Sequence, residues 1–195
     1  MATGTPQTGD RKLIAAVLKG DQESFSELVG RYQGRLVNYL FRLLRDLDEA
    51  HDLAQEVFLK IYQALDRYDP QYKFSTWLFR VARNAAIDRI RKRRIHFVSM
   101  DRRRDDDGPE GTWEPKSATA GPYENRRNVE RSAAIQQAID NLPWEYRQLI
   151  VLRHYGELTY DEIATSQNMP LGTVKNKLFR ARQMLKEHLR DYLTD

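Results

Sequence analysis

The chain has 195 residues, of which 31% are charged and 41% hydrophobic, with a formal net charge of +4 and no cysteine. This length allows one large or two small domains, and the composition suits a helical protein with modest cores. Without cysteine the chain can hold no disulfide and no thiolate metal site. It also lacks an apolar run of membrane-spanning length and a signal-peptide core. We therefore expect a cytoplasmic protein with no membrane insertion. The scattered histidines predict no metal site, and we expect no cofactor.

The first helices are predicted from caps and apolar spacing. Residues 1–10 are polar and predict a disordered tail. Asp10 is a candidate cap for a helix over residues 11–19, which Gly20 would end. Asp21 would start the next helix, whose apolar residues recur at three- and four-residue steps as far as Arg45.

The helix predicted over residues 48–65 carries two different faces. One is an apolar stripe that includes Val57, Ile61 and Tyr62 and would face a core. The other face carries four candidate binding residues: Asp52, Gln55, Glu56 and Leu59. Most such faces are simply solvated. A leucine among acidic and amide side chains, however, is typical of an anchor in a polar protein interface.

The sign of the charge reverses after this helix. Residues 46–66 hold six acidic side chains, whereas residues 67–94 hold nine basic ones against Asp69 and Asp88 alone. Such a reversal within forty residues indicates two different partners docking side by side.

An aromatic loop and a basic helix follow. Pro70 restrains the loop over residues 67–74, and Ser75 is a candidate cap for a helix over residues 75–94. Aromatic rings interleaved with cations suit single-stranded nucleic acid, because bases stack on rings while Lys and Arg follow phosphates. The alternative places Trp77 and Phe79 in the core and the arginines in solvent. The candidate strand-binding residues are Tyr68, Gln71, Tyr72, Lys73, Phe74, Arg80, Arg83 and Asn84.

Residues 95–127 show no helical period and are rich in charge, Gly, Pro, Ser and Thr, which predicts a linker. Its 33 residues would span roughly 110 Å when fully extended. Two roles stay open. The linker is a spacer, or its three consecutive aspartates imitate a nucleic acid strand in a basic channel.

Helices resume at residue 128. Pro143 suits the first turn of a helix that reaches Tyr155, and Thr159 with Glu162 fits a capping box. A short helix, a turn at residues 168–170 and a last helix to about Leu189 predict a helix-turn-helix motif.

The last helix has one face that must pack inward and one suited to reading bases. An exposed Phe179 between Asn176 and Arg180 has little use on a merely solvated helix, whereas Asn suits adenine, Arg suits guanine and Phe suits a thymine methyl. The candidate duplex-reading residues are Thr173, Lys175, Asn176, Phe179, Arg180 and Arg182.

Two long segments carry a family resemblance. DLAQEVFLKIYQAL with FSTWLFRVARNAAIDRIRKRR resembles region 2, and LTYDEIATSQNMPLGTVKNKLFRARQMLKEHL resembles region 4, of sigma-70 factors of the extracytoplasmic-function (ECF) group. The resemblance implies an all-α fold of two small domains, residues 11–94 and 128–195, joined by a flexible linker. It implies a promoter-specificity subunit, and not an enzyme.

The resemblance also implies partners. The subunit would bind core RNA polymerase, through the clamp of its largest subunit and the flap of its second-largest, and an anti-sigma factor. By motif match Asp52, Gln55 and Glu56 would dock on the clamp coiled coil. The aromatic loop would take a base flipped from the minus-ten strand, with Asn84 beside it, and the last helix would read the minus-thirty-five duplex.

Two other classes of protein compete with this interpretation. A free-standing helix-turn-helix regulator would leave the acidic face and the aromatic loop unexplained. An enzyme acting on nucleic acid would need paired catalytic carboxylates beside a nucleophile, a phosphate-cradling Gly loop or a metal cluster, and the sequence shows none.

Overall fold

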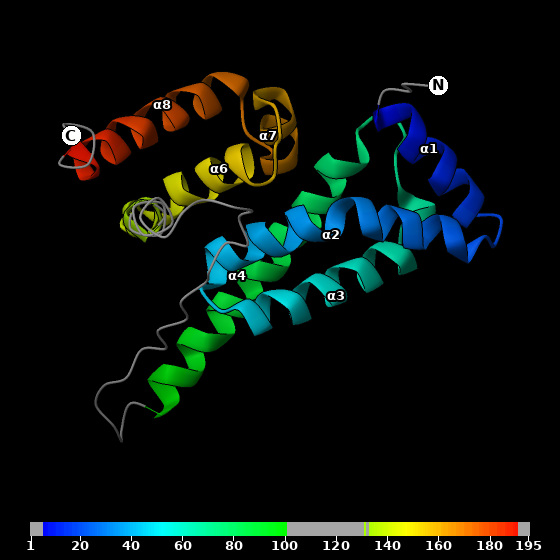
Figure 1. Cartoon of the computed structure of the whole chain (residues 1–195), viewed down its shortest axis with the longest axis horizontal. Coiled ribbons are helices and arrows are strands. Elements are labelled where there is room, and N and C mark those ends of the chain that lie inside the picture. The colour runs from blue at the N-terminus through cyan, green and yellow to red at the C-terminus, as the bar shows by residue number, and fades with distance from the viewer. Residues whose placement is uncertain (1–5, 101–130, 132, 191–195) are drawn as a thin grey trace, which may run out of the picture.

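All regular secondary structure that the computed structural model describes, over residues 6–100, 131 and 133–190, is helical. This confirms the all-α prediction. The N-terminal half contains α1 (Pro6–Val17), α2 (Gln22–Leu44), α3 (Leu47–Gln63), the 3-10 turn η1 (Leu65–Arg67) and α4 (Phe74–Met100). The C-terminal half contains a helical segment over residues 133–140, then α6 (Trp144–His154), α7 (Tyr160–Gln167) and α8 (Leu171–His188) (Figure 1).

Side-chain caps fix several helix starts. The Asp21 carboxylate accepts hydrogen bonds from the first turn of α2, as predicted. At α7 the Thr159 hydroxyl accepts from the Glu162 N–H while the Glu162 carboxylate accepts from the Thr159 N–H, so the predicted capping box is confirmed. These bonds satisfy backbone donors that a helix start leaves without a partner.

Three predicted boundaries are wrong. First, α1 begins at Pro6, so the predicted tail is helical over residues 6–10, while residues 1–5 lie outside the described residues. Asp10 is therefore not a cap. It is buried inside the fold, where Arg31 and Tyr32 both donate hydrogen bonds to its carboxylate.

The other two errors are at the ends of α4. The helix already includes Phe74, so Ser75 lies within its first turn and is not its cap. It also continues to Met100, through residues 95–100 of the predicted linker. The rest of that prediction, residues 101–127, lies outside the described residues.

The long helix α2 lies at the centre of the N-terminal half and packs against α1, α3 and α4. Tyr39 of α2 and Phe79 of α4 are fully buried and meet edge to face, with ring centroids 5.2 Å apart. Figure 1 shows α3 on the side of α2 and α4 away from α6, α7 and α8. The outer face of α3 is thus left open.

The C-terminal half is a helix-turn-helix supported by α6. Ile163 of α7 and Val174 and Leu178 of α8 are fully buried, and they pack with the apolar residues of α6. None of the described helices is long and apolar enough to cross a membrane.

The two halves pack against each other. Helix α6 lies against α2, and α7 lies against α4. Buried apolar residues of both halves belong to one continuous cluster. The described chain therefore has its two halves in direct contact.

Candidate functional site

The predicted binding face of α3 is exposed. Asp52, Gln55, Glu56 and Leu59 all lie on the open side of the helix, and Leu59 is 57% exposed. Arg89 of α4 reaches across to Glu56, with a nitrogen-to-oxygen distance of 2.6 Å. The acidic charge at Glu56 is therefore partly balanced within the chain.

An aromatic pair extends this face beyond the predicted residues. Tyr62 was assigned to the core stripe, and this is wrong, because its side chain is 43% exposed. Its ring lies edge to face with Phe25 of α2, with centroids 4.8 Å apart. Tyr62 lies three residues after Leu59, about one helical turn. That spacing places both side chains on the same face of α3, and it could have predicted the exposure of Tyr62 from the sequence.

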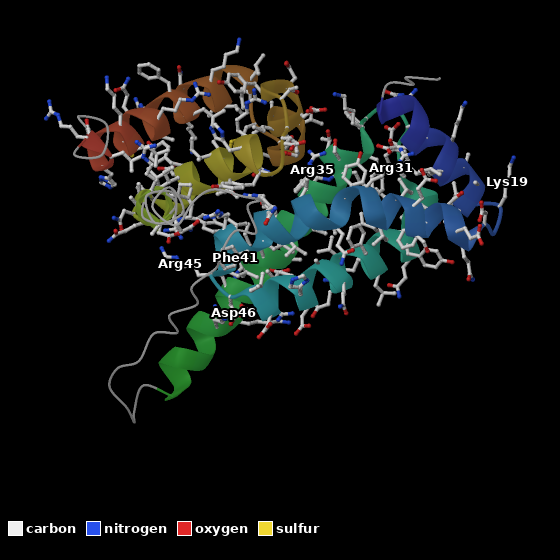
Figure 2. The ribbon with its side chains drawn as sticks, in the orientation of Figure 1. Lys19, Arg31, Arg35, Phe41, Arg45 and Asp46 are labelled. Carbon is white, nitrogen blue, oxygen red and sulfur yellow. The ribbon has the colours of Figure 1, made fainter. Side chains whose placement is uncertain are left out.

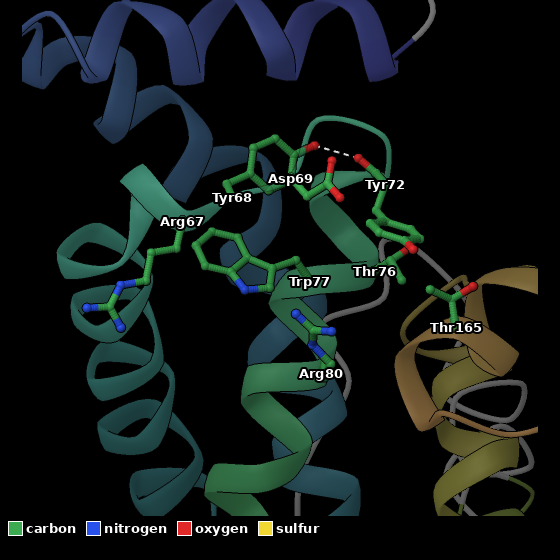
Figure 3. A pocket seen from close by; sticks show the side chains of 8 residues that line it. All are labelled: Arg67, Tyr68, Asp69, Tyr72, Thr76, Trp77, Arg80 and Thr165. Carbon is green, nitrogen blue, oxygen red and sulfur yellow. Dashed lines mark hydrogen bonds between the residues drawn. The ribbon is translucent and has the colours of Figure 1, made fainter.

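A pocket opens beside the aromatic loop (Figure 3). It has a volume of about 210 Å³, several times the roughly 30 Å³ that one water occupies in the liquid. The lining residues are Arg67, Tyr68, Asp69, Tyr72, Thr76, Trp77, Arg80 and Thr165. All but Thr165 come from η1, the loop and the start of α4, whereas Thr165 comes from α7.

Aromatic contacts fix one wall of the pocket. The Tyr68 and Trp77 rings lie 5.5 Å apart at a tilt of 37°, and the Tyr68 hydroxyl donates a hydrogen bond of 2.6 Å to the Tyr72 carbonyl. The Tyr72 side chain is 49% exposed. Arg67 and Arg80 are exposed at the rim. The arrangement offers ring faces for stacking and cations for phosphates.

The predicted strand-binding residues do not all reach this surface. Phe74 is wrong as a direct contact, because it is 1% exposed and its ring packs among Tyr32, Tyr68 and Trp77. It supports the pocket from beneath. Gln71 and Asn84 are exposed, as a contact requires.

The two remaining strand-binding candidates are already engaged by the C-terminal half. Lys73 pairs with Glu162 of α7 at 2.7 Å, and the Arg83 Nε donates a hydrogen bond of 2.8 Å to the buried Gln148 of α6. Partial burial alone would raise the pKa of Glu162. Its pKa nevertheless lies below the usual value, because Lys73 and Thr159 stabilise the charged form.

Further contacts join the halves along α2. Arg35 pairs with Glu157 at 3.2 Å and also donates a hydrogen bond to the Gly156 carbonyl. Just after the C-terminal end of α2, Arg45 pairs with Asp140 at 3.0 Å. Figure 2 labels Arg35 on α2 and Arg45 just after its C-terminal end. Sequence patterns could not find these pairs, because the partners are about a hundred residues apart in the chain.

The predicted reading face of α8 is open. Lys175, Asn176 and Arg180 are exposed, and Phe179 is 61% exposed. Thr173 is half-buried at the start of the helix. Arg182 differs from the others, because it donates a hydrogen bond to the Tyr160 hydroxyl and its guanidinium lies 5.8 Å from that ring.

Comparison with known proteins places the chain in a family. Residues 28–95 match sigma-70 region 2, and residues 132–185 match sigma-70 region 4. The chain is 39% identical to the ECF RNA polymerase sigma factor SigW of Bacillus subtilis, over 93% of this chain and 97% of that protein. The chain belongs to the ECF group of sigma-70 factors.

Other relatives agree with this assignment. The sigma factor is 34% identical to the ECF RNA polymerase sigma-E factor of Escherichia coli K12, covering 92% of this chain and 93% of that protein. The solved structure of CnrH in complex with the cytosolic domain of CnrY superposes with a TM-score of 0.65 at 25% identity, over 94% of this chain and 98% of CnrH. RpoE from Bartonella quintana was solved with the anti-sigma factor NepR. It superposes with a TM-score of 0.70 at 21% identity, covering 86% of this chain and 98% of that chain, which shows a shared fold.

Among the described residues no group of acidic or histidine side chains could hold a metal ion. Three exposed features remain as candidate binding surfaces: the open side of α3, the aromatic pocket and the exposed face of α8. The match to region 2 begins at residue 28, so α1 lies outside it.

Proposed function

We propose that this sigma factor divides promoter recognition among three surfaces. As a member of its family it binds core RNA polymerase and directs transcription initiation at specific promoters. We assign core-polymerase docking to Asp52, Gln55, Glu56 and Leu59, with Tyr62 extending that face. The pocket between Tyr68, Tyr72 and Trp77 takes an unpaired minus-ten base, and the exposed face of α8 reads the minus-thirty-five duplex.

The observation that carries the proposal is the pocket itself. It is open to solvent, walled by Tyr68 and Trp77, and rimmed by Arg67 and Arg80. A protein that binds only intact duplex has no use for such a site. Extruding a base costs a few kcal/mol, and stacking returns about 1–3 kcal/mol per base. Strand capture in the pocket would therefore favour promoter melting.

Binding at both promoter elements requires the two halves to separate. The elements are roughly 25 base pairs apart, or about 85 Å along the duplex. A compact chain of this length has a radius of gyration of only about 16 Å. Residues 101–130 can span up to roughly 100 Å by covalent geometry. Separation also frees Lys73 and Arg83, and it removes Thr165 from the pocket wall.

The remaining assignments belong to the same proposal. We assign residues 11–94, with α1, to the region 2 unit and residues 128–195 to the region 4 unit, joined by the intervening linker. The proposed site of action is the cytoplasm, where core polymerase and promoter DNA are present. RpoE from Bartonella quintana was solved with an anti-sigma factor, and we propose that a protein of this kind regulates this chain as well.

Open-complex formation tests the pocket assignment. Tyr72→Ala should slow opening of duplex promoters, and a template pre-melted over the minus-ten bases should restore part of the activity because its unpairing cost is already met. Permanganate footprinting of melted thymines measures the effect. Tyr62→Ala is the matched control. Any loss of polymerase docking would lower the activity on the duplex and the pre-melted templates equally. If Tyr72→Ala melted duplex promoters as fast as the wild type, the assignment would be contradicted.

A further inference from the structure

Helix α1 contacts the aromatic loop directly. Arg11 donates a hydrogen bond from Nη2 to the Pro70 carbonyl at 2.5 Å, across 59 residues of sequence. Pro70 lies between Tyr68 and Tyr72, the two loop residues whose positions define the pocket. Burial raises the pKa of the Tyr68 hydroxyl above its usual value. The nearby positive charge of Arg11 opposes part of that rise.

A second route links α1 to the floor of the pocket. The buried Asp10 carboxylate accepts hydrogen bonds from the Tyr32 hydroxyl and from Arg31, the latter at 3.0 Å. The Tyr32 ring meets Phe74 edge to face, with centroids 5.2 Å apart, and Phe74 in turn lies 6.1 Å from Trp77. Burial and the hydrogen bond to Asp10 raise the pKa of Tyr32.

A glycine in α1 leaves room for this network. A Cβ at position 9 would lie 2.8 Å from Nη1 of Arg31, the atom that bonds Asp10. Glycine inside a helix costs stability relative to alanine. Its presence here is compatible with the close approach of Arg31 to Asp10.

We propose that α1 is a positioning element for the strand-capture pocket, with Arg11 holding the loop at Pro70 and Asp10 holding the floor through Tyr32 and Phe74. The proposal rests on the pocket function proposed above. A loop held in its binding geometry loses less conformational freedom when a base enters, so affinity rises without any contact between α1 and DNA. Arg11 is a positioning residue in this account.

The test uses holoenzyme assembled with core polymerase and a fluorescent pool of single-stranded DNA randomised over the minus-ten bases. Arg11→Ala should weaken binding of the pool about two- to tenfold, the range expected for one hydrogen bond. Arg11→Lys retains a donor for the Pro70 carbonyl and should recover part of the loss. Lys12→Ala removes an equal charge from an exposed neighbouring position and should bind as wild type.

Salt dependence separates positioning from direct contact. If Arg11 only positions the loop, the slope of log K against log salt stays at the wild-type value in Arg11→Ala. A slope reduced by about one would mean that Arg11 contacts a phosphate, and the positioning role would be wrong. Equal losses of affinity in Arg11→Ala and Lys12→Ala would also overturn it, because the loss would then come from the removal of any positive charge.

Two further measurements keep the outcomes distinct. The thermal midpoint of Arg11→Ala should match that of Lys12→Ala, and a selective drop would make Arg11 a stability residue and contradict the proposal. Tyr72→Ala measured with the same DNA pool tests the pocket itself. If Tyr72→Ala binds as wild type, the pocket assignment fails. If Tyr72→Ala loses binding while Arg11→Ala does not, only the role of α1 fails.

Discussion

Charge reversals between the two halves should open the molecule. Arg45→Glu faces Asp140, and Glu157→Lys faces Arg35, so each replaces an attraction at 3.0–3.2 Å with a repulsion. The Arg45 and Glu157 side chains are 52% and 65% exposed, so each half should still fold. Neither residue belongs to a proposed polymerase or DNA surface.

The magnitude follows from this exposure. A solvent-exposed ion pair contributes about 0.2–1 kcal/mol, and a like-charge contact costs a similar amount. The double variant should therefore shift the balance between closed and open forms by about 1–3 kcal/mol, which is about 5- to 150-fold. Salt at about 1 M, with a screening length of about 3 Å, should act in the same direction on the wild-type chain.

Förster transfer between two dyes measures the opening. The chain has no cysteine, so single cysteines introduced at the exposed Gln63 of α3 and Lys186 of α8 give unique labelling sites. Transfer efficiency should fall in the double variant while helical circular dichroism stays constant. The control Lys19→Glu with Glu187→Lys makes equal charge changes at exposed positions and should leave transfer unchanged. Equal transfer in the double variant and the wild type would refute the reasoning.

Two further predictions concern the other surfaces. Glu56→Lys should weaken binding to core polymerase, because a reversed charge at a complementary interface is costly. It also removes the ion pair between Glu56 and Arg89. Unchanged affinity in a pull-down would contradict the docking face. Arg180→Ala should relax discrimination at particular minus-thirty-five bases by about 1–3 kcal/mol. Competition between promoter duplexes measures this. A uniform loss of affinity on all sequences would instead make Arg180 a contact to the DNA backbone.

The features predicted well from sequence are those that local signals determine. Asp21 and the Thr159–Glu162 box start helices through bonds within three residues, so a short window of sequence contains the cause. The exposed Leu59 and Phe179 were likewise visible as apolar residues on otherwise polar faces. In both cases the physical reason lies within one helical element.

The features that were missed depend on distant parts of the chain. Asp10 has the residue type of a cap, but Arg31 and Tyr32 of another helix satisfy its carboxylate in the core. Phe74 follows the loop aromatics directly, and only the packing of Tyr32 beneath it shows that it points inward. The pairing of Lys73 with Glu162 depends on how the two halves meet, which no local pattern contains.

Transcription by core polymerase tests the central claim most directly. A duplex library randomised over the minus-thirty-five and minus-ten positions should give transcripts only when this chain is added, and the transcribed templates should be enriched for a preferred sequence at both elements. Adding the Tyr72→Ala chain should reduce transcript yield from the same templates. If the chain instead selected duplexes without polymerase, and core polymerase produced no chain-dependent transcripts, it would be a free-standing DNA-binding regulator and the account would be contradicted.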